Sequence, residues 1–138
     1  DDLALVPAME FVADGTSQRW GIPVTLRGTV SGSLPLPVET ALYRAAQEGL
    51  TNVARHAQAT RAEITLHQSP HVVSCSVRDD GLGCDPAVLA SPNNGRRGLG
   101  LIQIRERLGA LGGTLRLVRR VPGTEFVVEI PLEASTWA

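Results

Sequence analysis

The chain has 138 residues, of which 43% are hydrophobic and 20% charged, with a formal net charge of −1. This length suits one domain with a substantial core and is short for two. The near-neutral charge provides no basic surface for nucleic acid, and no apolar run approaches the roughly 20 residues that a membrane helix needs. We therefore expect one cytoplasmic domain over residues 1–138 that contacts neither nucleic acid nor a membrane, whether or not the full-length protein is membrane-anchored.

The basic and sulfur-containing residues narrow the chemistry further. All 13 basic residues are arginine, which excludes a lysine Schiff base and a Walker-A lysine. Cys75 and Cys84 lack the spacing of a metal site and are too few for a disulfide framework. Any phosphate chemistry must therefore use arginine, backbone amides, helix ends or a bound metal ion.

Hydrophobic periodicity predicts alternating helices and strands along the chain. The expected order is a helix over 3–20, a strand from 24 to about 29, a helix over 39–57, a hairpin of strands 62–67 and 72–78, a loop over 79–97, a helix over 99–111, and a hairpin around Pro122 and Gly123 that ends at Pro131. Hairpins indicate a mixed, mostly antiparallel sheet, and three amphipathic helices need one face of it. The predicted fold is a two-layer α+β sandwich.

A polar face runs along the predicted helix 39–57. Glu48 and Asn52 are four residues apart, and Arg55 and His56 follow, so all four are expected on one side. An asparagine oxygen suits Mg²⁺, and a carboxylate one turn away can take a proton from a nucleophile or hold a metal-bound water. Taken alone, this pattern is more typical of a solvated polar helix face than of a binding site.

The second motif, VRDDGLGCD, follows a predicted strand. Asp79 stands at the strand end, where its carboxylate can accept a hydrogen bond from an exocyclic amine. Gly81 and Gly83 allow the backbone to turn tightly and to approach a ligand. By itself, the segment also fits a common glycine turn capped by aspartate.

The third motif, GRRGLGLIQIRERLGALGG, is predicted to open a helix after the long loop. Amides at a helix N-terminus bind anions, and Gly98 and Gly100 would let a phosphate approach closely. Arg96 and Arg97 add positive charge there. A dinucleotide-binding fingerprint is excluded, because no strand leads directly into these glycines and no βαβ unit follows.

The order and spacing of the three motifs are more specific than any one of them. ExxxNxxRH on a helix, DxGxG after a strand and GLGL after a long loop resemble the N, G1 and G2 boxes of sensor histidine kinases. The resemblance is strongest over residues 37–132 and implies the Bergerat ATP-binding fold with an ATP lid over 84–97. GLGLIQIRERLGALGGTL, without a separate F box, resembles the branch that includes nitrate and membrane-fluidity sensors.

This resemblance implies a role for each matching residue. Asn52 would coordinate Mg²⁺ on the ATP phosphates, Glu48 would polarise the nucleophile or a water, and Asp79 would accept the adenine amino group. The other residues implied to bind the nucleotide are Arg55 and His56 near the phosphates, Gly81 and Gly83 at the adenine pocket, Gly98, Leu99 and Gly100 at the lid hinge and phosphate cradle, and Thr124 near adenine. Gly49 stands where the family often has alanine, which leaves open whether it makes room for the nucleotide.

The implied activity is transfer of the γ-phosphoryl group of ATP to a histidine, for relay to a response regulator. Such transfer rests mainly on positioning and charge neutralisation. None of His56, His67 and His71 has the acidic context of the family's acceptor. The acceptor is therefore expected on an upstream dimerisation domain of a homodimer, and the chain alone is expected to bind Mg-ATP without phosphorylating itself.

Two alternatives remain beside a histidine kinase. One is an anti-sigma-factor serine kinase or another ATPase of this fold, such as a gyrase or mismatch-repair clamp. The other is a degenerate module that docks a partner without turning over ATP. The stretch RERLGALGG favours the histidine kinase over the first, and the intact Glu48, Asn52, Asp79 and Gly100 disfavour the second.

Overall fold

The structure is a computed structural model that describes residues 5–30, 34–82 and 95–132. These residues form α1 (Leu5–Trp20), β1 (Val24–Gly28), α2 (Leu36–Asn52), the π-helical turn η1 (Val53–Ala57), β2 (Ala62–Gln68), β3 (Val72–Asp79), α3 (Gly95–Gly109), β4 (Thr114–Arg119) and β5 (Thr124–Pro131). The order of helices and strands agrees with the order that the sequence predicts. No helix in these ranges is long and apolar enough to cross a membrane.

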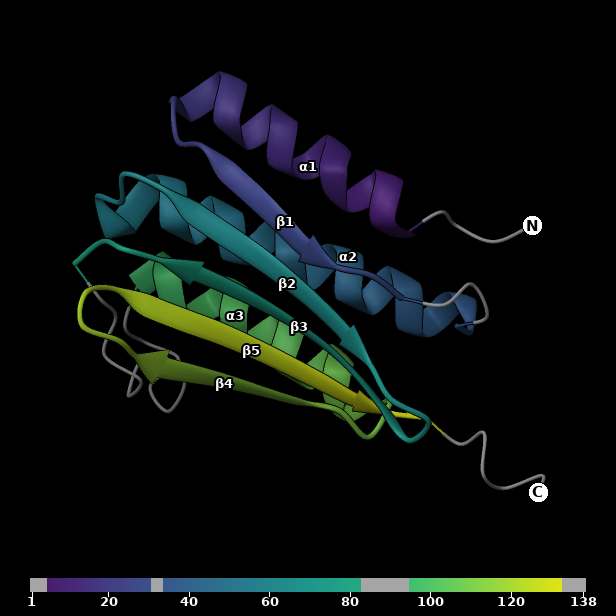
Figure 1. The fold of residues 1–138 in the computed structure, drawn as a ribbon. Helices are drawn as coiled ribbons and strands as arrows, with labels where there is room; N and C mark the ends of the chain where they lie inside the picture. Colours follow the sequence, from purple (N-terminus) through teal and green to yellow (C-terminus); the bar gives the residue numbers. More distant parts are fainter. Residues whose placement is uncertain (1–4, 31–33, 83–94, 133–138) are drawn as a thin grey trace.

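The strands form one five-stranded sheet in the order β1-β2-β3-β5-β4. The pair β1 and β2 is parallel, since α2 crosses between them, and the other three pairs are antiparallel. All three α-helices cover the same face of the sheet (Figure 1). The predicted two-layer α+β sandwich with a mixed, mostly antiparallel sheet is therefore confirmed.

Alternate strand residues face the helices and build the core. The largest fully buried side chains of this core come from both layers: Met9, Leu42, Leu50, Ile64, Leu66, Val73, Cys75, Val77, Leu108, Val128 and Ile130. Gly49 of α2 faces this core, because a Cβ there would lie 3.2 Å from Val77 Cγ2 and 3.4 Å from Phe126 Cδ1. Gly49 therefore brings α2 close to the sheet, and it does not make room for a nucleotide.

Among the helix boundaries that differ from the prediction, two concern predicted site residues. The helix predicted over 39–57 is a regular α-helix only to Asn52 and continues as the π-helical turn η1, so the regular α-helical spacing behind the prediction of one face through Arg55 and His56 ends at Asn52. The helix predicted over 99–111 begins instead at Gly95, so Gly98, Leu99 and Gly100 lie inside α3. The start of α3 is rich in glycine, which has low helix propensity, and packing of α3 against α2 supplies stabilisation that this propensity does not reveal.

Part of the predicted lid lies outside the described residues. Residues 83–94, which include Gly83 and most of the segment 84–97, belong to that part. The end of the segment, residues 95–97, is helical in α3 and does not continue the loop.

Candidate nucleotide-binding site

Glu48 and Asn52 form a linked pair on adjacent turns of α2. The Asn52 Nδ2 group donates hydrogen bonds to the Glu48 carbonyl oxygen at 2.8 Å and to Glu48 Oε2 at 3.0 Å. With its nitrogen used inside the helix, Asn52 keeps its side-chain oxygen for an outside partner. The same bond restrains the Glu48 carboxylate.

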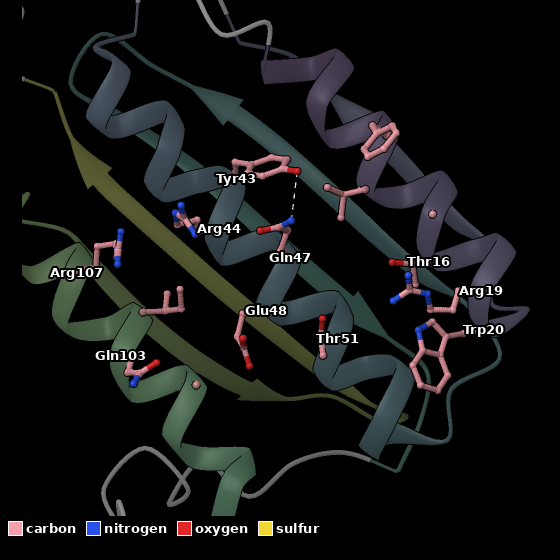
Figure 2. Close-up of a pocket in the computed structure, with 15 residues that line it drawn as sticks. Thr16, Arg19, Trp20, Tyr43, Arg44, Gln47, Glu48, Thr51, Gln103 and Arg107 are labelled. Atoms are coloured by element: carbon pink, nitrogen blue, oxygen red, sulfur yellow. Dashed lines mark hydrogen bonds between the residues drawn. The ribbon is translucent and has the colours of Figure 1, made fainter.

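Helix α3 reaches this pair at Gly100. A Cβ on Gly100 would lie only 2.7 Å from Cδ of Glu48, so the missing side chain allows the carboxylate to rest on the α3 backbone. Figure 2 shows Glu48 pointing from α2 toward α3. The structure thus brings together Glu48, Asn52 and Gly100, which belong to two motifs about fifty residues apart in the chain.

Asp79 and Thr124 stand at one end of the sheet, on neighbouring strands. They lie one position beyond the paired residues Arg78 and Glu125, and both are buried. Asp79 Oδ1 accepts a hydrogen bond from the Gly81 amide at 2.8 Å, which fixes the carboxylate beside the turn. The second motif therefore forms a turn at the end of β3 that holds the Asp79 carboxylate in place.

The Thr124 hydroxyl is the unusual group in this region. Its residue is 7% exposed, and its Oγ1 has no hydrogen-bond partner among the residues that the structure describes. Leaving a buried hydroxyl unpaired costs about 1–3 kcal/mol, and such groups commonly meet a water or a ligand. Thr124 therefore offers a free hydrogen-bonding group next to Asp79.

Asp80 is a structural residue that the sequence analysis did not single out. It accepts hydrogen bonds from the backbone amides of Thr60 at 2.8 Å and Arg61 at 3.1 Å, and from the Thr60 hydroxyl. The hydroxyl bond is the main reason that the pKa of Asp80 is below its usual value. Asp80 thus ties the segment after η1 to the end of β3; its only sequence signal was the doubled acid before Gly81.

Gly123 holds the β4–β5 turn over the same strand end. Its φ of +96° is in the left-handed region, and a Cβ there would lie 2.7 Å from the Asp79 carbonyl carbon and 3.0 Å from Asp80 Cα. Only glycine satisfies both conditions without strain. The sequence marked Gly123 as a turn residue, but its contact with Asp79 depends on the sheet order.

The remaining predicted site residues are Arg55, His56, Gly83, Gly98 and Leu99. Arg55 is exposed on η1, and Gly98 lies within α3. Gly83 and the side chains of His56 and Leu99 lie outside the described part of the structure. Within that described part, no group of three or more His, Cys, Asp or Glu side chains could hold a metal ion.

Comparisons with known proteins agree with this architecture. The family model of histidine kinase-, DNA gyrase B- and HSP90-like ATPases matches residues 38–134. The sensor histidine kinase MctS of Rhizobium johnstonii is 32% identical over 136 residues, which cover 98% of this chain and 29% of MctS. The histidine kinase domain of the Erythrobacter litoralis EL346 blue-light activated kinase is 26% identical, with a TM-score of 0.73 over 97% of this chain and 64% of that chain.

One further solved structure shares the fold. Full-length ShkA in complex with AMPPNP superposes with a TM-score of 0.75 at 20% identity, over 95% of this chain and 30% of that chain. Fold and site together define an ATP-binding domain of the histidine kinase type. The chain belongs to the family of histidine kinase-, DNA gyrase B- and HSP90-like ATPases. It spans about a third of the length of curated sensor kinases that it matches, at 29%, 33% and 31% of three of them.

Proposed function

We propose that this chain binds Mg-ATP and delivers its γ-phosphoryl group to a histidine on a separate helical domain of the full-length kinase. The observation that carries the proposal is the meeting of Glu48, Asn52 and Gly100, from two helices, at one point. The Asp79 and Thr124 groups at the sheet end supply a second set of polar contacts, suited to adenine.

Each residue has a distinct proposed role. Asp79 accepts the adenine amino group, and Thr124 offers its unpaired hydroxyl to the ring or to a bridging water. Asn52 presents its side-chain oxygen to the cation, and Glu48 takes the proton from the attacking group or orients it. Gly98, Leu99 and Gly100 line the phosphate side, with Arg55 and His56 nearby, and Gly81 and Gly83 border the adenine.

The residues present fit a magnesium ion that is held mainly by its substrate. Mg²⁺ keeps several waters and takes one or two protein ligands plus phosphate oxygens, rather than a dedicated protein cage. Asn52 can supply one such ligand, because its nitrogen is already bonded within α2. When bound, the ion neutralises the phosphate charge during transfer.

The proposed partners follow from the relatives, which are named sensor histidine kinases. We infer an upstream dimerisation domain that carries the acceptor histidine, a response regulator that receives the phosphoryl group, and a homodimeric, cytoplasmic catalytic region. A serine-directed kinase of the same family remains the second candidate.

Titration of the chain with a fluorescent ATP analogue and Mg²⁺ tests nucleotide binding. Asn52→Ala and Asp79→Asn are expected to weaken binding about tenfold or more, because hydrogen bonds to charged groups contribute about 1.5–3 kcal/mol. Gln18→Ala and Asp14→Asn, which change an exposed amide and an exposed acid of α1, are the matched controls. Absence of binding by the unaltered chain, or equal affinity in both site variants, would contradict the proposal.

The acceptor is identified by the stability of the phosphoryl bond. The full-length kinase is incubated with labelled ATP, and a histidine acceptor gives label that acid removes and alkali preserves. Alkali-labile phosphoserine on another protein would instead favour the serine kinase.

A further inference from the structure

The backbone pairing of β2 with β3 ends at Ala62 and Asp79, and the side chain of Asp80 continues the contact beyond it. Continued pairing in the same register would place Arg61 opposite Asp80. Instead, Asp80 Oδ1 accepts the backbone amides of Thr60 at 2.8 Å and Arg61 at 3.1 Å, while Oδ2 accepts the Thr60 hydroxyl. The Asp80 carboxylate therefore anchors residue 80 to the segment that leads from η1 into β2.

The β4–β5 turn holds the same residue from another side. A Cβ on Gly123 would lie 2.7 Å from the Asp79 carbonyl carbon and 3.0 Å from Asp80 Cα, so this turn rests directly on the peptide between Asp79 and Asp80. The Arg61 guanidinium lies 3.9 Å from Asp80 Oδ2 but is 80% exposed, so this ion pair adds little. Hydrogen bonds and close backbone packing, rather than charge pairing, restrain residue 80.

Asp80 is also the middle residue of a turn whose two ends are bonded to each other. Asp79 Oδ1 accepts the Gly81 amide at 2.8 Å, and the Asp79 side chain is buried. Rotation of the backbone at residue 80 would move the Gly81 amide relative to Asp79 and release the Asp79 carboxylate. The anchor on Asp80 therefore controls the direction of its neighbour's side chain.

We propose that Asp80 is a positioning residue for adenine recognition, which acts through Asp79. By fixing the middle of the turn over residues 79–81, it holds the Asp79 carboxylate in the direction that the adenine amino group requires. Hydrogen bonds weaken steeply when donor and acceptor are misaligned, so a misdirected carboxylate loses affinity for the amino group in particular. This inference rests on the proposed function, because it requires Asp79 to accept that amino group.

The preference of the chain for a nucleotide that carries the amino group measures this role. ATP is compared with purine riboside triphosphate, which lacks the 6-amino group, by calorimetric titration of the chain with Mg²⁺ present. The unaltered chain is expected to bind ATP about tenfold or more tightly than the analogue, because a hydrogen bond to a charged group contributes that factor. Asp80→Ala is expected to lower this preference about fivefold or more, through weaker binding of ATP.

Two milder variants keep part of the anchor. In Asp80→Asn, the side-chain oxygen can still accept both backbone amides and the nitrogen can donate to the Thr60 hydroxyl oxygen, so the preference should stay within about twofold. Thr60→Val removes the hydroxyl bond alone and should lower the preference about threefold. Circular dichroism identifies folded variants, and Thr60→Val decides the question where Asp80→Ala does not fold.

Ile130→Val is the control for a general loss of stability. Ile130 is fully buried in β5 and pairs with Val73, at the opposite end of the β3–β5 ladder from Asp79. Its truncation destabilises the core but should leave the nucleotide preference within about twofold.

Three results would overturn the positioning role while ATP binding still stood. They are an unchanged preference in the folded Asp80 and Thr60 variants, equal weakening of both nucleotides, and an equal fall of the preference in Ile130→Val. Equal affinity of the unaltered chain for ATP and the analogue would instead contradict the proposed contact between Asp79 and adenine. Absence of ATP binding by the unaltered chain would defeat the proposed function as a whole.

Discussion

At the proposed phosphate side of the site, contacts of single atoms set the position of Glu48. Glu48 is held from one side by the Asn52 amide and from the other by the bare backbone of Gly100. Neither neighbour is charged, so the position of the carboxylate depends on one hydrogen bond and on the absence of one methyl group. Small substitutions here should therefore change the chemistry more than the stability.

Gly100→Ala tests that expectation. The new methyl group would collide with the Glu48 carboxylate, which can swing away at small cost because it ends a flexible side chain. We expect the free energy of unfolding to change by no more than about 1 kcal/mol, since alanine favours the helix by a similar amount. The rate of phosphoryl transfer should fall about tenfold or more, as measured in the full-length kinase.

Gly109→Ala is the matched control on the same helix. A Cβ at Gly109 would meet nothing within 4 Å, so this variant should gain helix stability and keep its transfer rate. If Gly100→Ala behaved in the same way in both measurements, the contact with Glu48 would have no catalytic role.

Thr124→Val tests separately how the buried hydroxyl affects the free energy of unfolding and how it affects ATP binding. Replacement by an apolar group of similar shape should raise the free energy of unfolding of the nucleotide-free chain by about 1 kcal/mol, because the unpaired oxygen disappears. The same change should weaken ATP binding several-fold, measured by titration. Thr65→Val, at a half-buried position of β2, is the control. A large loss of stability in Thr124→Val would show that the hydroxyl has a structural partner.

At the scale of elements, the site depends on how strand ends and helix ends are joined. Asp80 connects the segment after η1 to the end of β3, while Gly123 lets the β4–β5 turn close over Asp79. These contacts hold the segment that follows α2 in a fixed relation to the end of the sheet that carries Asp79 and Thr124. The spacing between the Asn52 side and the Asp79 side is therefore set by loops rather than by the helix alone.

The Asp80 contacts make stability depend on pH. Hydrogen bonds lower the pKa of Asp80 in the folded state below 3.8, so its contribution is fully present above that value and is lost as pH falls through the lower folded-state pKa. Asp80→Asn should reduce the free energy of unfolding by about 1–2 kcal/mol at pH 7, because charge-assisted hydrogen bonds are lost. Urea unfolding at pH 7 and near pH 2 should show this difference shrinking in acid.

Asp14→Asn provides the comparison for that experiment. Asp14 is exposed on α1, and its replacement should change the free energy of unfolding little at either pH. A difference between Asp80→Asn and the unaltered chain that stayed constant from neutral to acid pH would show that the Asp80 charge does not contribute.

For the whole molecule, one sheet covered by helices on a single face must supply the core. Cys75 lies at its centre, 1% exposed, and burial raises the pKa of its thiol to about 12. A thiol of that pKa is almost entirely protonated near neutral pH and reacts only when the core opens. The rate at which the Cys75 thiol reacts therefore reports how often the core opens.

Alkylation of Cys75 tests this description of the core. In a Cys84→Ser variant, which leaves Cys75 as the single thiol, labelling at pH 8 should be at least about 1,000-fold slower in the native chain than in urea. The mass increase on labelling gives the rate. Rapid labelling of the native chain would show that the sheet and helices open locally around β3.

The sequence predicted the elements whose periodicity was long and regular, and it failed where packing overrides local preference. Alternation at Ile64, Leu66, Val73 and Val77 predicted the central hairpin, because one face of each strand is buried. The start of α3 at Gly95 was missed, because glycine has low intrinsic helix propensity and the contact with α2 is invisible in the local sequence. The π-helical turn after Asn52 was missed for the same kind of reason.

The sequence by itself determined the class of protein, because three short motifs in a fixed order specify the same chemistry wherever the fold brings them together. Only the tertiary structure decided that Gly49 serves the core, that Gly100 supports Glu48, and that Asp80 and Gly123 secure the end of β3. It also assembled a groove of about 550 Å³ that residues of α1, α2 and α3 line. The physical reason is that motifs fix the types of residue by local spacing, whereas contacts between residues distant in the chain depend on strand order and helix packing.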